Sequence, residues 1–422
     1  IVAHSYARVP FYRRTWDKAE VSVPRLRGRG DLPMLPVITK GSLLSRSLTD
    51  RLSESVDPRK TVKRGTSGTS GSPIETHMTR PEFRFRQMVL LLSLYSDAGW
   101  ALPVHIVEAG AWITATDPRP VIRHRRGPAT VTYISRKPPP DEQARHLAGT
   151  KPTVLTGSPS SLHIIASEFV RSGVAAPRPR VTVVRGEVLR PDVRSLLQEV
   201  FGARVVDYYN SQEIGSMARQ CRENPAVMHV NHDACVIEVV DDEGCPVSPG
   251  CEGDVVVTSL YNTSMPFVRY KLADRTVLLQ NHRFPCRCGR CTETISPPLG
   301  RDDDVIVLPD LQRVTSEAVT DVVMAASRGV GIESGFTRSL RFQIIQESLA
   351  HITVRIASQE PCPKQFRIQV EESIGALHRD LRCDLEEVPE IDPGESGKPK
   401  IVLSFVAGER MAKATSRDPA RH

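Results

Sequence analysis

The feature that most constrains the fold is an alternation of short apolar runs with helical segments in the middle of the chain. Strand-like runs and amphipathic segments follow one another at 104–107, 130–134, 154–155, 160–172, 181–184 and 191–201. Strands alternating with helices of this length are typical of a parallel sheet covered by helices. The sequence therefore predicts an α/β fold with parallel strands in a large N-terminal domain.

The pattern changes in the second half of the chain. Short strands with Gly/Pro turns predict a small β subdomain at about 218–300. Beyond it, a strand–strand–helix–strand pattern is expected at 341–346, 351–356, 366–381, 386–388 and 400–406. We therefore expect a large N-terminal domain at 1–303 and a compact α+β cap domain at 304–422.

Length and composition are consistent with this division. The chain has 422 residues, which is too long for one compact core, and no apolar run approaches the roughly 20 residues of a membrane span. It begins at Ile1 without a signal-like segment, and its nine cysteines are unevenly spaced and odd in number. We therefore expect a soluble, cytoplasmic protein in a reducing compartment, without a membrane partner.

The net charge of +7 raises the question of nucleic-acid binding. The densest basic cluster, Arg119 to Arg126, contains no interleaved aromatic residues that would stack bases. We interpret it as a solvated basic face and expect no nucleic-acid partner. Attraction of an anionic substrate is compatible with the same charge.

Two loops have the residue types of a nucleotide site. The first consists of small and hydroxylated residues that can approach phosphate oxygens closely, namely Thr66, Ser67, Gly68, Thr69, Ser70 and Gly71. The second, from Asp207 to Gly215, follows a strand-like run and places Glu213 on the turn after it. A phosphate-binding loop and a carboxylate able to hold Mg²⁺ indicate nucleotide binding.

Together and in this order, the two loops resemble those of the adenylate-forming acyl-CoA ligase superfamily, and in particular its phenylacetate–CoA ligase and coenzyme F390 synthetase-like branch. The resemblance implies that Gly186 and Glu187 line an adenine pocket. It implies that Tyr209 stacks on the base and that Asp207 lies near the adenine amino group. The family's usual Gly-x-Thr-Glu reads Asn210-Ser-Gln-Glu213 here, so Gln212 stands at the α-phosphate position and Glu213 keeps the Mg²⁺ role.

Later motifs extend the resemblance towards the C-terminus. Asp274, in a stretch like Arg-Tyr-x-x-Gly-Asp, would accept the ribose hydroxyls. Arg301 would reach ribose or phosphate, and Asp303 would be the hinge between the two main domains. Lys398, in Ser396-Gly-Lys-Pro-Lys400, would be the lysine that neutralises charge during adenylation, with Lys400 as a weaker alternative. The family's lysine beside the phosphate loop is missing, and Lys63 or Arg64 could substitute for it.

The cysteines form a separate pattern. Cys286-Arg-Cys-Gly-Arg-Cys291 is a tight knuckle, preceded by Cys221 and His229. Thiolates and an imidazole bind Zn²⁺ tetrahedrally, and similar sets are structural zinc sites in some members of this branch. The resemblance implies Cys221, His229, Cys286 and Cys288 as ligands, with Cys291 and then His232 in reserve. The other cysteines are expected to be small core residues, namely Cys235, Cys245, Cys251, Cys362 and Cys383.

The resemblance implies ATP-dependent activation of a carboxylic acid, expected to be aromatic, to acyl-AMP with release of pyrophosphate. Transfer to a thiol, coenzyme A, would follow, with Mg²⁺ at Glu213. Two other functions stay open at this point: transfer to an amine or a carrier protein, and nucleotide binding without catalysis. Homodimers are common in this branch, but the sequence leaves the oligomeric state, the acid and the acceptor open.

Overall fold

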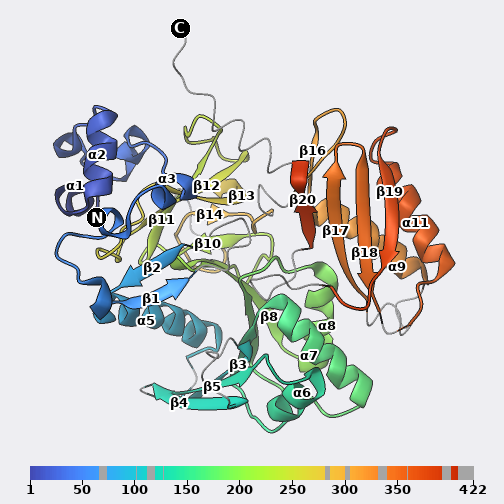
Figure 1. Cartoon of the computed structure of the whole chain (residues 1–422). Coiled ribbons are helices and arrows are strands. Elements are labelled where there is room, and N and C mark those ends of the chain that lie inside the picture. Colours follow the sequence, from blue (N-terminus) through green and yellow to red (C-terminus); the bar gives the residue numbers. More distant parts are fainter. Residues whose placement is uncertain are drawn as a thin grey trace. The chain divides into compact units, whose positions relative to one another are not determined.

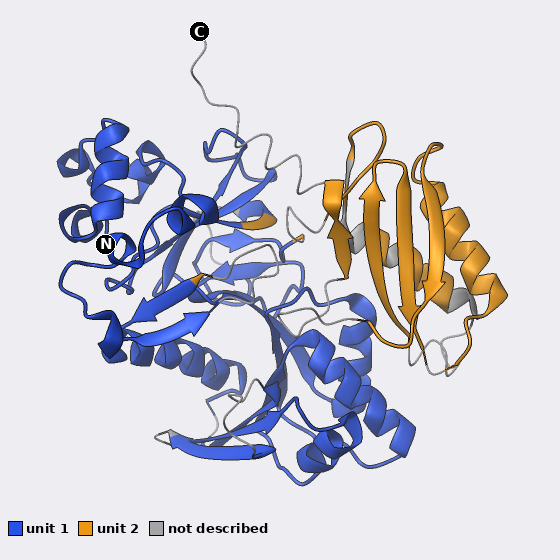
Figure 2. Cartoon of the chain, in the orientation of Figure 1, with its two compact units in different colours: residues 1–66, 75–272, 276–298 blue, residues 67–74, 273–275, 299–422 orange. Residues whose placement is uncertain are grey.

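The computed structural model (Figure 1) describes residues 1–65, 74–100, 102–111, 119–126, 128–280, 286–299, 305–330, 340–358, 360–391 and 401–406. The chain divides into two compact units (Figure 2). The large unit consists of residues 1–66, 75–272 and 276–298, and the small unit of residues 67–74, 273–275 and 299–422.

A 12-stranded sheet with the order β11-β12-β13-β14-β10-β9-β8-β7-β6-β3-β5-β4 forms the centre of the large unit. Its parallel part contains β3 (Val104–Ala111), β5 (Ala129–Ser135), β6 (Val154–Gly157), β7 (Val181–Arg185) and β8 (Arg204–Ser211). The edge strand β4 (Val121–Arg126) runs antiparallel to β5. The predicted α/β fold with parallel strands is confirmed.

Helices cover both faces of the parallel strands, which explains why these strands read as nearly continuous apolar runs. On one face, α6 (Pro140–Ala148), α7 (Pro159–Ser172) and α8 (Pro191–Phe201) pack on side chains such as Leu155 and Val205. On the other face, α5 (Arg80–Asp97) packs on Ile106, Val183 and their neighbours. We call this second side the α5 face.

The antiparallel part of the sheet continues beyond β8. It contains β9 (Gly215–Gln220), β10 (Met228–Val230), β11 (Cys235–Val240), β12 (Glu252–Ser259), β13 (Tyr270–Gln280) and β14 (Thr294–Ile295). These strands account for the Gly/Pro turns of the expected β subdomain, and they belong to the same sheet as the parallel strands.

The N-terminal segment packs on this antiparallel part. It contains α1 (Val2–Arg8), α2 (Pro10–Lys18), α3 (Lys40–Leu44) and α4 (Leu48–Arg51), short 3₁₀ helices at Val23–Arg25, Arg29–Met34 and Pro58–Lys60, and the hairpin of β1 (Val62–Gly65) and β2 (Glu75–Met78). The buried Tyr12 hydroxyl donates to the carbonyl oxygen of Pro266 and accepts the N–H of Val268, both at 2.9 Å. This phenol therefore fastens α2 to the chain just before β13.

The small unit has an apolar core between one sheet and two helices. The sheet has the order β19-β18-β17-β20, formed by β17 (Arg341–Ser348), β18 (His351–Ala357), β19 (Arg382–Glu387) and β20 (Val402–Ser404). The helices are α9 (Ser316–Val330) and α11 (Lys364–Gly375), and β15 (Val305–Val307) pairs with β16 (Arg313–Thr315). The buried Gln346 side chain accepts the N–H of Val307 at 2.9 Å and donates to its carbonyl at 2.6 Å.

Several sequence-based expectations need correction. The helix expected to reach residue 381 ends at Gly375, and the basic cluster contains the strand β4. Cys245 and Cys251 are exposed, because they lie in turns beside β11 and β12 and not in the core. Among the described residues, no helix is both long and apolar enough to cross a membrane.

Candidate nucleotide site and cysteine–histidine cluster

The parallel strands β3, β6, β7 and β8 end at one edge of the sheet. Gly186 and Glu187 directly follow β7, and the turn with Glu213 directly follows β8. Ligands of open α/β sheets bind outside the carboxyl ends of the strands. The described residues predicted for adenine and Mg²⁺ therefore lie at the edge where a ligand is expected.

Strand β8 presents Asp207 and Tyr209 to the same face, because side chains alternate along a strand. Val205, which precedes them at the same spacing, packs with α7 and α8, whereas Tyr208 between them packs on the α5 face. Asp207 is 7% exposed, and burial raises its pKa to about 7 although the nearby Arg194 opposes the shift. This carboxyl group is consequently ready to change its charge near neutral pH.

The Tyr208 hydroxyl on the opposite face donates to Asp97, at the end of α5. Arg204 and Arg219 lie 3.5 and 3.7 Å from the Asp97 carboxylate. The middle of β8 is therefore anchored through the buried carboxylate of Asp97. The side chains on either side of Tyr208, those of Asp207 and Tyr209, point to the opposite face of the sheet.

The segment after β7 is shaped by a glycine in the left-handed region. Gly186 has a φ of +83°, which an L side chain adopts only with strain. One carboxylate oxygen of Glu187 accepts the backbone N–H of Ser160 at 3.0 Å. Glu187 therefore holds the first turn of α7 next to the segment that resembles the family's adenine pocket.

The turn that contains Glu213 is fixed from outside by Arg86 of α5. Its guanidinium donates to the carbonyl oxygens of Gln212 at 2.6 Å and Ser211 at 3.1 Å. Gly215 follows with a φ of +96°, and a Cβ there would lie 3.2 Å from Arg86. The turn is thus held in one conformation with Glu213 partly exposed and Gln212 exposed.

Arg86 is aimed at the turn because the start of α5 is itself fixed. Glu82 accepts the N–H and hydroxyl of Thr79, both at 2.7 Å, which is a capping box. Its other oxygen accepts the N–H groups of Thr263 and Ser264 at 2.8 and 2.9 Å. Burial acts to raise the pKa of Glu82, but hydrogen bonds from the hydroxyls of Ser264, Thr263 and Thr79 outweigh it and leave the pKa lowered.

Sequence reasoning missed Arg86. It is a polar residue near the start of α5, and about 125 residues separate it from the carbonyls that it binds. A possible signal is the stretch Arg84-Phe-Arg86 before the apolar part of the helix, but nothing in that stretch indicates which of the two arginines contacts a distant turn.

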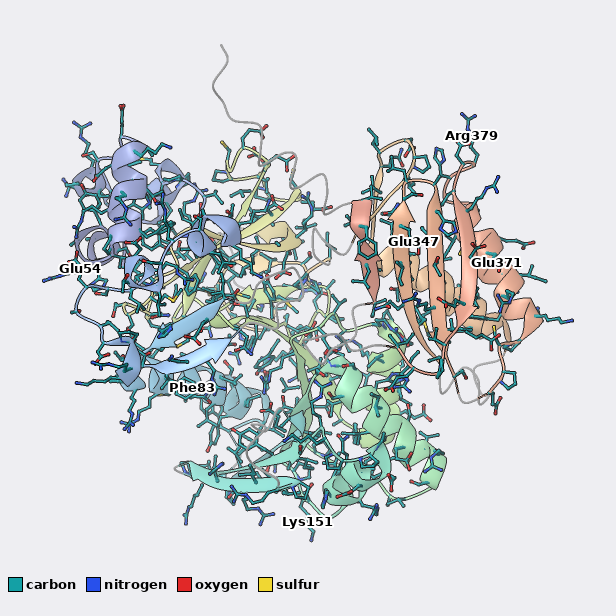
Figure 3. The ribbon with its side chains drawn as sticks, in the orientation of Figure 1. Glu54, Phe83, Lys151, Glu347, Glu371 and Arg379 are labelled. Carbon is teal, nitrogen blue, oxygen red and sulfur yellow. The ribbon has the colours of Figure 1, made fainter. Side chains whose placement is uncertain are left out.

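Several predicted site residues lie outside the described residues. These are the phosphate loop Thr66, Ser67, Gly68, Thr69, Ser70 and Gly71, together with Arg301, Asp303 and Lys398. Asp274 lies on β13 and is partly exposed. Of the two suggested substitutes for the missing lysine, Lys63 lies 3.6 Å from Glu75, and Arg64 stacks over the Phe83 ring at 5.2 Å (Phe83 is labelled in Figure 3).

The structure brings together the side chains predicted to bind zinc. One ligand atom from each of Cys221, His229, Cys286 and Cys288 lies within 4.8 Å of all the others. The Sγ atoms of Cys221 and Cys286 are 3.6 Å apart, and Cys288 Sγ lies 3.2 Å from His229 Nε2. Cys291 is exposed and lies outside this group.

The neutral imidazole of this cysteine–histidine cluster suits a metal site, and its thiols would lose their protons when a metal binds. Burial, followed by the charge of Arg290, lowers the pKa of His229 to about 4, so its imidazole is neutral at pH 7. The backbone N–H of Cys288 lowers the pKa of Cys286, whereas burial raises that of Cys288 to about 11. Two buried thiols, a third sulfur and a neutral imidazole form a closed set that fits tetrahedral Zn²⁺.

The cysteine–histidine cluster lies close to β8 in the order of the strands of the sheet. His229 on β10 lies opposite Arg219 on β9, and Arg219 lies opposite Tyr208 on β8. The cluster therefore begins two strands away from the residues that flank Tyr208.

A separate cleft of about 510 Å³ lies between the N-terminal segment and β11 to β13 of the large unit. Its lining includes Pro33, Val37, Asp241 and Lys271. None of the predicted site residues that the structure describes lines it, so we do not assign it to the nucleotide site.

Comparisons with known proteins point to one family. The profile described as "AMP-binding enzyme" matches residues 126–265. A phenylacetate-coenzyme A ligase of Thermus thermophilus is 30% identical over 319 residues, which are 73% of this chain and 69% of that ligase. A phenylacetate-coenzyme A ligase of Escherichia coli K12 is 25% identical over 329 residues, covering 76% of this chain and 73% of its own.

Solved structures show the same fold. A 2-hydroxyisobutyryl-CoA ligase in the postadenylation state, in complex with 2-HIB-AMP, aligns with a TM-score of 0.74 at 20% identity, covering 98% of this chain and 89% of that one. An anthranilate CoA ligase in complex with anthranoyl-AMP aligns with a TM-score of 0.57 at 14% identity, covering 92% and 75%.

Proposed function

Because the chain belongs to the phenylacetate–coenzyme A ligase family of AMP-binding enzymes, we propose that it activates a carboxylic acid with ATP and transfers the acyl group to coenzyme A. An oxygen of the acid attacks the α-phosphorus, giving acyl-AMP and pyrophosphate. The thiol sulfur then attacks the acyl carbonyl, AMP leaves, and the thiol proton goes to solvent. The observation that carries this proposal is strand β8, with Asp207, Tyr209 and the Glu213 turn at the carboxyl edge of the sheet.

In this proposal the adenine lies against Tyr209, with Gly186 and Glu187 beside it. The pKa of Asp207 is about 7, so the ionised form is available to accept a hydrogen bond from the adenine amino group. Gln212 is exposed on the turn and can donate a side-chain hydrogen bond towards the α-phosphate. Positioning and neutralisation of charge provide most of the catalysis in such a transfer.

Glu213 is the residue that would hold Mg²⁺, which binds through carboxylate oxygens and neutralises phosphate charge when present. Arg86 supports this role because it fixes the backbone carbonyls on the N-terminal side of Glu213. A partly exposed carboxylate on a fixed turn is accessible to a nucleotide without rearrangement of the sheet.

The other assigned residues complete the cycle. The phosphate loop at 66–71 would bind the β- and γ-phosphates, Asp274 the ribose, and Arg301 the ribose or a phosphate. Lys398 would act in adenylation only, and the cap would turn about Asp303 before the thiol reacts. A mobile lysine stabilises the transition state without binding the ground state equally well.

For the cysteine–histidine cluster we propose structural Zn²⁺ on Cys221, His229, Cys286 and Cys288. The closed set of four protein ligands leaves no position for substrate, which favours a structural role over a catalytic one. Metal analysis of the purified protein should give about one zinc per chain, and Cys288→Ser should lose it. The exposed Cys245 is the matched control, and Cys245→Ser should keep the metal; zinc that persists in Cys288→Ser would contradict the ligand set.

The activity is tested by acid-dependent exchange of labelled pyrophosphate into ATP across aromatic acids. We expect exchange with at least one acid, and a loss of about 100-fold or more in Lys398→Ala. Lys364→Ala removes an exposed lysine of the same unit and should leave exchange unchanged. ATP binding without exchange by any acid would instead favour a non-catalytic nucleotide-binding protein.

The acceptor requires a separate measurement. Product analysis with coenzyme A, with amines and with a carrier protein separates thioester formation from transfer in natural-product biosynthesis. We expect the coenzyme A thioester. Formation of an amide alone would contradict the proposed second step and leave the first step intact.

A further inference from the structure

A row of side chains crosses the carboxyl edge of the sheet on the α5 face. Val131, Ile106, Val154 and Val183 all pack with α5, and each is followed two positions later by a residue on the same side of its strand. These four residues are Tyr133, Glu108, Thr156 and Arg185. Tyr133 lies opposite Glu108, and Glu108 opposite Thr156, in the registers of β5, β3 and β6.

The row contains an ion pair that spans a strand. Arg185 Nη2 lies 2.7 Å from Glu108 Oε2, with β6 between their two strands. The two side chains are 25% and 26% exposed, so both the carboxylate and the guanidinium can be reached by a ligand. An ionised carboxylate such as Glu108 in this pair can only accept hydrogen bonds.

The row also contains a buried hydroxyl that lacks a partner. Thr156 is 2% exposed, and its Oγ1 has no hydrogen-bond partner among the residues that the structure describes. Buried polar groups are nearly always hydrogen-bonded, so a hydroxyl of this kind calls for an explanation, such as a ligand. Thr156 lies beside Glu108, so a single donor could reach both groups.

The row is next to the proposed nucleotide site. Arg185 directly precedes Gly186 and Glu187 in the sequence. It is also close enough to Arg86, which holds the Glu213 turn, for its charge to add to the effect of burial in lowering the pKa of Arg86. An acid bound on this row would therefore present its carboxylate near the nucleotide.

Two glycines next to the row, Gly110 and Gly157, allow close packing of the backbone that supports it. A Cβ on Gly110, whose φ is +70°, would lie 2.4 Å from the Cβ of Ser161. A Cβ on Gly157 would lie 2.7 Å from the carbonyl oxygen of Ala109. The backbone of β3 and the start of α7 are therefore in direct contact at this edge, and the row lies on a rigid surface.

We propose that this row is the acid-binding subsite, and that it selects an aromatic acid with a hydroxyl or amino substituent. The inference rests on the proposed function and names its substrate class. The Glu108 carboxylate accepts the donor of the substituent, the Thr156 hydroxyl pairs with the same group, and the Tyr133 ring packs on the aromatic ring. An unsubstituted ring desolvates the Glu108 carboxylate without supplying a donor and leaves the Thr156 hydroxyl without a hydrogen-bond partner, which is how polar sites reject apolar analogues.

The test is pyrophosphate exchange with matched acids: benzoate and phenylacetate against their hydroxy and amino derivatives at each ring position. In the native protein, kcat/KM for the best substituted acid should exceed that of its parent by about 100-fold or more. Thr156→Val and Glu108→Gln should lower this ratio by about 10-fold or more, mainly through KM for the substituted acid. Thr156→Ser retains the hydroxyl and should retain the ratio.

Thr182 provides a matched control. It is also a fully buried threonine whose Oγ1 has no partner within the described part of the chain, but it alternates with Val181 and Val183 and so faces the opposite side of the sheet. Thr182→Val should leave the preference between substituted and parent acids unchanged. A thermal unfolding transition recorded for each variant shows whether a loss of exchange reflects loss of folding.

The outcomes separate this inference from the proposed function. Equal exchange with substituted and parent acids would overturn the inference and leave the proposed activity standing. A preference for an aromatic dicarboxylic acid, such as isophthalate, would also overturn it, because it would assign recognition to Arg185 in place of Glu108. Absence of exchange with every acid would instead contradict the proposed function.

Discussion

The two units place their charged side chains differently. In the large unit Arg269 is 2% exposed, pairs with Glu238 at 3.1 Å and donates to the carbonyl oxygens of Pro33, Leu35 and Gly244. In the small unit the charged pairs lie on the surface, where Glu347 and Glu371 are labelled in Figure 3. Its interior is an apolar cluster crossed by the hydrogen-bonded Gln346.

The difference shows what buried charge does in this chain. Three charged groups of the large unit hold chain segments next to strands of the central sheet: Arg269 holds the N-terminal segment, Arg86 the Glu213 turn, and Asp97 the strand β8. The exposed pairs of the small unit hold side chains that water solvates well. We therefore expect charge removal to be costly in the first unit and nearly neutral in the second.

The largest effect is expected for Arg269→Met. The change leaves Glu238 buried without its cation and removes the donor of three carbonyl groups, so the free energy of unfolding should fall by about 3–5 kcal/mol. Chemical denaturation of the native chain and the variant measures this difference in the free energy of unfolding. The double variant Arg269→Met/Glu238→Leu should recover part of the loss, and a single-variant loss below about 1 kcal/mol would show that this buried pair behaves like a surface pair.

Asp207 should make stability depend on pH. Its pKa is about 7 in the folded chain and near 3.9 when unfolded. Between these values the folded state holds a proton that the unfolded state has lost, so stability should fall as pH rises from about 4 to 7 and level off above. The drop should be of the order of 4 kcal/mol.

The pH dependence is tested with unfolding curves of the native chain and Asp207→Asn. Asparagine cannot ionise, so the variant should lack this part of the profile and gain stability relative to the native chain at pH 8. Identical profiles for the two proteins would indicate that Asp207 is ionised throughout and that water or a neighbouring charge compensates for its burial.

A smaller effect on stability but a clear one on activity is expected for Arg86→Lys. A lysine cannot donate to two carbonyls in the same fork, so the Glu213 turn loosens and exchange should fall by about 100-fold. Arg84→Lys changes an exposed arginine two residues earlier on α5 and is the matched control. Equal activities of the two variants would show that Arg86 is not needed to position Glu213.

The smallest effect is expected for His351→Gln in the small unit. The hydrogen bond to Asp384 at 2.8 Å, with further help from Glu347, raises the pKa of His351. The resulting stabilisation is present below about pH 6.5 and is lost as pH rises through the folded pKa. His351 is 32% exposed, so the variant should lose less than about 1 kcal/mol at pH 5. A loss like that of Arg269→Met would end the contrast between the units.

The parts of the fold that follow local patterns were predictable from the sequence. The helix at Pro191–Phe201 and the strand with Asp207 and Tyr209 carry their own periodicity, and Pro191 marks the helix start. Strand β4 was missed because Arg123, His124 and Arg125 make it look like a polar loop, although exposed charges are common on edge strands.

The candidate site was predictable only where its residues are close in sequence or chemically distinctive. The cysteine–histidine cluster was predicted because few residue types bind zinc and because the family resemblance implied Cys221 and His229 as partners of the knuckle. Arg86, Glu108 and Arg185 were missed because arginine and glutamate are common. Their significance comes from contacts between segments that are distant in the sequence, which one sequence does not reveal.

The close packing at Gly110 and Gly157, next to the proposed acid-binding subsite, also sets limits for protein engineering. Gly110 and Gly157 have no room for a Cβ, so a library that randomises them would consist mostly of misfolded members. Variation at Tyr133, Glu108, Thr156 and Arg185 changes side chains above an intact backbone. A search for ligases with new acid preferences should therefore keep both glycines and randomise the other four positions.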